Sequence, residues 1–100
     1  MVIGCCSVKF YLHGNNSLKG KRRVIRAIKD RVKNGFNVSV AEVGDQDVWQ
    51  SIQLGISAVG TDQPYIDGLL SKVIDAIDRM NLAEIVDYKT ETLNIGSKIY

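Results

Sequence analysis

The chain has 100 residues, 45% of them hydrophobic, one proline and a formal net charge of +2. This length suits one compact domain and leaves little surplus for a second. No apolar run approaches the roughly 18 residues that cross a bilayer, and two adjacent cysteines, Cys5 and Cys6, exclude a disulfide framework. We therefore expect a cytoplasmic protein with reduced thiols and no membrane contact.

The first elements are predicted to be a strand and a long helix. Apolar and more polar side chains alternate over residues 2–12, which is typical of a half-buried strand. Residues 13–16 have turn chemistry, and the hydroxyl of Ser17 can cap a helix over residues 17–34. Gly35 is predicted to end that helix in a left-handed conformation.

The second half of the chain is predicted to repeat this alternation of strands and helix. Strands are expected over residues 36–43, 49–59 and 85–93, and an amphipathic helix over residues 64–80. The order β-α-β-β-α-β predicts an α+β, ferredoxin-like sandwich, with a four-stranded antiparallel sheet and two helices on one face. We expect a single domain over residues 1–93 and a C-terminal tail over residues 94–100.

Positive charge is concentrated in the first predicted helix. Residues 17–34 hold eight of the 13 Lys and Arg residues and one acid, Asp30, so the segment carries +7 and the rest of the chain −5. At about 100° per residue, most of these cations form one stripe beside the apolar face. Lys21 falls within the apolar arc instead, and we expect its side chain to snorkel past the end of the core.

Cations in a first helical turn oppose the helix dipole, and a bound anion would relieve that repulsion. A solvated basic face and pairing with an acidic protein surface are the alternatives. The predicted nucleic-acid or anion contacts are Ser17, Lys19, Lys21, Arg22, Arg23, Arg26 and Lys29.

The sheet face that no helix covers is predicted to be flat. Its expected residues are small or polar, and they lack the aromatic side chains with which an RNA-recognition motif stacks bases. Small side chains let two sheets approach closely, so a second copy could pack there. Tryptophan near a sheet edge is also a frequent interface residue. The predicted interface residues are Ser39, Ala41, Gly55, Ser57 and Trp49.

The remaining polar residues point weakly to chemistry. Glu42, Asp45 and Asp47 at the turn before the third strand could hold a divalent ion or act as acid and base, although acids in turns are usually solvated. His13 is the sole histidine and a poor metal site alone. No phosphate-binding loop, dinucleotide fingerprint or nucleophile elbow is present. We predict no metal site, no cofactor and no catalytic residue.

Four segments carry a family resemblance: SLKGKRR at 17–23, NVSVAE at 37–42, DVWQ at 47–50 and LG at 54–55. In these the chain resembles the YlxP-like family of small bacterial proteins of unknown function. The resemblance implies a ferredoxin-like domain in the bacterial cytoplasm, often encoded beside factors for translation initiation and ribosome maturation, and hence an RNA or ribosome partner. Gly20 departs from the family pattern and weakens the first helical turn by up to about 1 kcal/mol relative to alanine.

We therefore predict a non-enzymatic, RNA- or ribosome-associated module whose first helix contacts phosphates. One alternative is a self-assembling, dimeric structural or regulatory domain that does not bind nucleic acid. Another is a binder of a small phosphorylated ligand at the start of the first helix. A homodimer is compatible with each of these functions.

Overall fold

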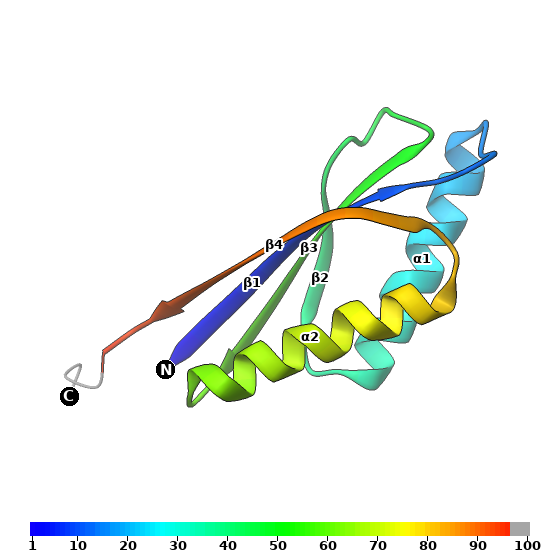
Figure 1. Ribbon diagram of the computed structural model, residues 1–100. Coiled ribbons are helices and arrows are strands. Elements are labelled where there is room, and N and C mark those ends of the chain that lie inside the picture. Colours follow the sequence, from blue (N-terminus) through cyan, green and yellow to red (C-terminus); the bar gives the residue numbers. More distant parts are fainter. Residues whose placement is uncertain (97–100) are drawn as a thin grey trace.

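The computed structural model describes residues 1–96 and has the predicted α+β, ferredoxin-like architecture. Figure 1 shows two helices on one face of a twisted sheet, with the other face uncovered. The elements are β1 Val2–Tyr11, α1 Leu18–Gly35, β2 Ser39–Gly44, β3 Ser51–Gly60, α2 Gln63–Met80 and β4 Glu84–Asn94. The four strands are antiparallel in the order β2-β3-β1-β4, which confirms the predicted topology.

Hydrophobic burial explains the alternation seen in the sequence. On β1 and β3 every second side chain faces the helices and is buried, and α1 and α2 each bury one apolar stripe against them. Gly4 marks the closest approach of β1 to α2, because a Cβ there would lie 2.3 Å from Cγ2 of Ile66. The largest fully buried apolar side chains are Phe10, Ile28, Ile52, Leu54, Ile56, Ile66, Ile77, Val8, Val32 and Val73.

Helix ends follow the predicted capping with one exception. The Ser17 hydroxyl accepts a hydrogen bond from the amide of Gly20 at 3.0 Å, and Asp62 caps α2 in the same way. Gly35 is not left-handed as predicted: it is the last residue of α1, and the cap is extended Phe36, whose amide donates to the carbonyl of Val32 at 2.9 Å.

The predicted tail begins beside the sheet. The amide of Ile95 donates to the carbonyl of Met1 at 2.8 Å, next to the last pair of the β1–β4 ladder. The rest of the predicted tail, residues 97–100, lies outside the described residues. Within the described part of the chain, no helix is long and apolar enough to cross a membrane.

Candidate functional site

Six of the eight Lys and Arg residues of α1 lie on one face of the helix, which we call the α1 stripe. Its side chains are exposed, except that of Lys29, which is half-buried. The ion pairs among residues 1–96 join Lys9 to Asp45, His13 to Glu84 and Lys21 to Glu42. None of them includes a member of the stripe, so no carboxylate among the described residues forms an ion pair with it. The stripe consists of Lys19, Arg22, Arg23, Arg26, Lys29 and Lys33.

A groove of about 340 Å³ runs along part of the stripe, between α1 and β2. It is lined by four of the cations, Arg22, Arg26, Lys29 and Lys33, together with Ile25, Asp30 and Glu42. Lys33 was not among the predicted contacts, although its position on the helical wheel places it with Arg22 and Arg26. Four cations and two carboxylates line this groove, so its net charge is positive.

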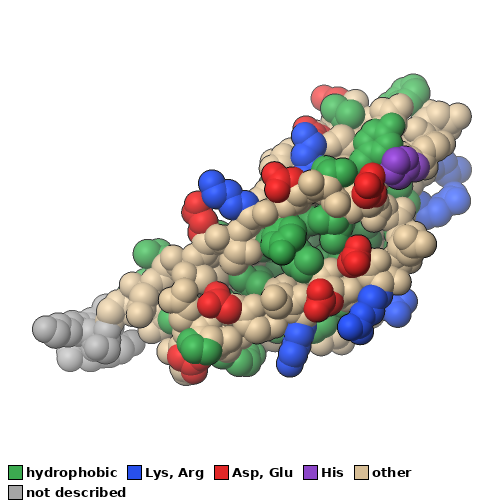
Figure 2. All heavy atoms as spheres, in the orientation of Figure 1, with side chains coloured by type: hydrophobic (Ala, Val, Ile, Leu, Met, Phe, Trp, Pro, Cys, Tyr) green, Lys and Arg blue, Asp and Glu red, His purple; other side chains and the backbone are tan. Residues whose placement is uncertain are grey.

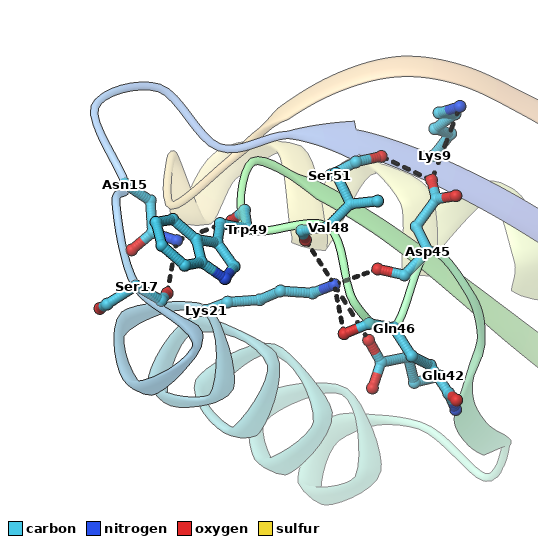
Figure 3. Close-up of polar contacts among 10 residues, drawn as sticks. All are labelled: Lys9, Asn15, Ser17, Lys21, Glu42, Asp45, Gln46, Val48, Trp49 and Ser51. Carbon is cyan, nitrogen blue, oxygen red and sulfur yellow. Dashed lines mark hydrogen bonds and ion pairs between the residues drawn. The ribbon is translucent and has the colours of Figure 1, made fainter.

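Lys21 is not part of the stripe, and the prediction that it reaches solvent is wrong. The residue is 1% exposed, and its ammonium group lies inside the protein (Figure 3). Nζ donates to the carbonyl oxygens of Asp45 at 2.5 Å and Val48 at 2.8 Å, and it lies 3.4 Å from Oε2 of Glu42. A buried ammonium needs such partners, and the β2–β3 loop supplies them, so Lys21 cannot contact an external phosphate.

The Lys21 contacts make the β2–β3 loop a fixed structure. Asp45 adopts a left-handed conformation with φ of 56°, and its carboxylate accepts a hydrogen bond from the Ser51 hydroxyl at 2.6 Å and lies 3.6 Å from the Lys9 ammonium. The Ser51 hydrogen bond is the main cause of a lowered pKa at Asp45, and the charges of Lys9 and Lys21 lower it further. Asp45 and Glu42 therefore stabilise the loop through these contacts.

The start of α1 is closed by its own side chains. Asn15 Nδ2 donates to the carbonyls of Ser17 at 2.8 Å and Trp49 at 2.7 Å, and a Cβ on Gly20 would lie 2.3 Å from Oδ1 of Asn15. Gly20 is thus required for this close approach. Ser17 uses its hydroxyl internally as the cap, so the predicted anion contact at Ser17 and a small-ligand site at this turn gain no support from the geometry.

Trp49 is separated from the other predicted interface residues. It lies in the loop between β2 and β3, and Figure 3 shows its indole ring near Asn15 and the first turn of α1. The side chain remains 46% exposed. Sequence reasoning did not anticipate the Asn15 bridge, because it joins two loops that are distant in the chain. The sequence indicates the bridge only by a polar residue, Asn15, two positions before the helix cap Ser17.

The other four predicted interface residues do lie together on the uncovered sheet face. Ser39 is opposite Ser57, and Ala41 is opposite Gly55, in the β2–β3 ladder. This face is hollowed by about 520 Å³ rather than flat. The physical reason is that small side chains occupy the middle, whereas Val43 on β2 and Lys89 and Glu91 on β4 line its edges.

A second hollow lies between β4 and α2. Figure 2 shows hydrophobic side chains in a hollow between β4 and α2, with carboxylates around it. This hollow of about 230 Å³ is lined by Leu70, Ile74 and Tyr88 and bordered by Asp67 and Asp75. His13 lies near the start of β4, with Nε2 2.7 Å from Oε1 of Glu84. Carboxylates therefore border this hollow, whereas cations outnumber carboxylates in the groove beside α1.

Comparison with known proteins identifies the family. Residues 3–90 match the model described as Protein of unknown function (DUF503). The chain is 37% identical over 90 residues to the uncharacterized protein YlxP of Bacillus subtilis (strain 168). The aligned residues make up 90% of this chain and 98% of that protein.

Two solved structures show the same fold at low identity. One is a de novo designed protein with a ferredoxin fold, at 16% identity and a TM-score of 0.55 over 100% of this chain and 93% of the other. The second is the protein YJCS, at 7% identity and a TM-score of 0.54 over 92% of this chain and 99% of the other. The chain therefore belongs to the DUF503 family of proteins of unknown function, and its similarity to YlxP confirms the resemblance seen in its sequence.

Proposed function

We propose that this protein is a non-enzymatic, cytoplasmic module that binds RNA, free or within a ribosomal particle, through phosphate contacts of the α1 stripe. The observation that supports this most strongly is that the stripe has no ion-pair partner among residues 1–96. Six cations on one helix face repel one another, and a polyanion relieves this repulsion and releases its own counterions. The contacts are Lys19, Arg22, Arg23, Arg26, Lys29 and Lys33.

Phosphate contact without base reading agrees with the chemistry of the stripe. Arginine guanidinium groups bind phosphate oxygens in a bidentate manner, and lysine acts as a mobile point charge. The groove between α1 and β2 places Arg22 and Arg26 beside Lys29 and Lys33. Such contacts position a nucleic acid and carry no sequence information directly.

Charge reversal tests the proposal with a matched control. The variant R22E/R26E changes two groove cations, and K72E/R79E changes two exposed cations on α2, so both lower the net charge equally. We expect R22E/R26E to abolish most RNA affinity in a fluorescence-anisotropy titration at low salt, and K72E/R79E to retain it. Equal losses in both variants would mean that net charge, and not the α1 stripe, causes binding.

Self-assembly through the uncovered sheet face is the second candidate. Ile3 lies between Val59 and Leu93 in neighbouring strands, and these last two side chains are 58% and 60% exposed at one end of the hollow. A second copy would bury this apolar row and fill the hollow. Sedimentation velocity tests it: we expect a dimer that Ser57→Arg dissociates, whereas a monomeric wild type at high concentration would reject it.

A further inference from the structure

We propose that the ligand of the α1 stripe is a single strand, and that Trp49 stacks on one of its unpaired bases. This inference rests on the proposed function and deepens it by naming the class of nucleic acid. Trp49 is the only tryptophan in the chain, and its side chain is 46% exposed beside the start of the stripe (Figure 3).

The exposed ring is held by a rigid support. Lys21 binds the carbonyl of Val48, the residue before Trp49, and Asn15 binds the carbonyl of Trp49 itself at 2.7 Å. The amide of Val48 also donates to the carbonyl of Asp45 at 3.1 Å. Because the backbone on both sides of the ring is fixed, stacking would cost little ordering of the loop. The loop backbone therefore holds the Trp49 side chain in its exposed position.

The Trp49 loop lies next to the first turn of α1, so an aromatic ring and the cations of the stripe are neighbours. Asn15 joins the carbonyl of Trp49 to that of Ser17, the cap of α1, so the loop and the first turn of the stripe are in direct contact. Proteins that bind single strands combine a cationic track for the backbone with aromatic rings for the bases. A duplex keeps its bases stacked inside and offers none to a lone ring. The arrangement therefore favours an unpaired strand.

The two aspartates of the loop differ in their contacts. The carboxylate of Asp45 is turned to Ser51 and Lys9, whereas Asp47 is exposed two residues before the ring. Exposed Asp47 repels phosphates and the cations of α1 attract them, so the proposed path of the strand runs from the ring to the stripe. The hollow of the uncovered sheet face has no aromatic side chain among its lining residues.

Intrinsic fluorescence gives a direct test, because all tryptophan emission comes from one residue. The probes are a uridine homopolymer strand and a blunt-ended RNA duplex of two complementary strands with the same number of phosphates. We expect the strand to quench the emission of Trp49 and the duplex to leave it nearly unchanged. Because the Trp49 variants lack this emission, their binding is measured by fluorescence anisotropy of labelled RNA. Trp49→Ala should weaken strand binding about ten-fold or more, with the salt dependence and the duplex affinity unchanged. Trp49→Phe should retain part of the preference, and it guards against a folding defect in the alanine variant.

The outcomes separate this inference from the proposed function. If both RNAs bind with strong salt dependence but Trp49→Ala binds the strand like wild type, stacking is rejected and the phosphate proposal stands. If neither RNA binds, both proposals fail. If Trp49→Ala alters sedimentation of the protein alone and leaves strand affinity unchanged, Trp49 belongs to a protein interface and the inference is overturned.

Discussion

Replacing Lys21 with methionine should destabilise the protein strongly, although the change removes only one of thirteen basic side chains. Methionine retains most of the aliphatic packing and loses the ammonium group. The carbonyls of Asp45 and Val48, now 2.5 and 2.8 Å from Nζ, then lose their donor, and Glu42 loses its partner. A hydrogen bond to a charged group contributes about 1.5–3 kcal/mol, and removing one member of a buried ion pair costs about 3–5 kcal/mol.

These contributions overlap, so we expect a loss of about 3 kcal/mol in the free energy of unfolding. In a domain of this length such a loss lowers the melting temperature by roughly 15 °C. Urea unfolding followed by circular dichroism measures the free energy, and thermal melting measures the temperature. Lys19→Met is the matched control, because Lys19 lies two residues away and is exposed, and it should change stability by less than about 0.5 kcal/mol. Equal stability of the two variants would refute the role given to Lys21.

Two further predictions concern the titratable groups. Cys5 is exposed, whereas Cys6 is buried and burial raises the pKa of its thiol. A thiol reagent should therefore modify Cys5 rapidly in the native protein and Cys6 only after unfolding. Equal rates in the native state would contradict this. Asp45 has a lowered pKa in the folded state, so the stability that its ionised form adds is complete above its ordinary pKa near ~3.9 and is lost as the pH falls through the lowered value. Ser51→Ala should raise the pKa of Asp45 toward the ordinary value in an NMR titration and shift this acid loss to higher pH; an unchanged pKa would mean that the hydroxyl has no such effect.

The fold could be predicted from the sequence because it depends on local periodicity. Apolar side chains alternate over residues 2–12 and recur with helical spacing in α1 and α2. Both patterns indicate which side chains are buried, and this burial packs the helices on the sheet. The chain order then restricts the topology to very few choices. The exposed cations of the α1 stripe are predictable for the same reason, since a helical wheel places them together in an arc beside the apolar face.

The site features that could not be predicted depend on loop conformation. Lys21 lies in the apolar arc, and no periodic pattern indicates that the β2–β3 loop turns its carbonyl groups toward that position. The left-handed conformation of Asp45 and the Asn15 bridge to Trp49 arise from the same packing of loop against helix. Without them, Trp49 was assigned to the sheet interface rather than to the start of α1. The hollow in the uncovered face likewise depends on the side chains of the two edge strands.

The claim that the α1 stripe binds the phosphates of a single strand is tested most directly by the salt dependence of wild-type affinity. The measurement is the dissociation constant for a uridine homopolymer strand at a series of salt concentrations. Neutralisation of six phosphates should give a slope of about −4 for the logarithm of affinity against the logarithm of salt concentration. A slope near zero, or no binding at the lowest salt concentration, would contradict the account.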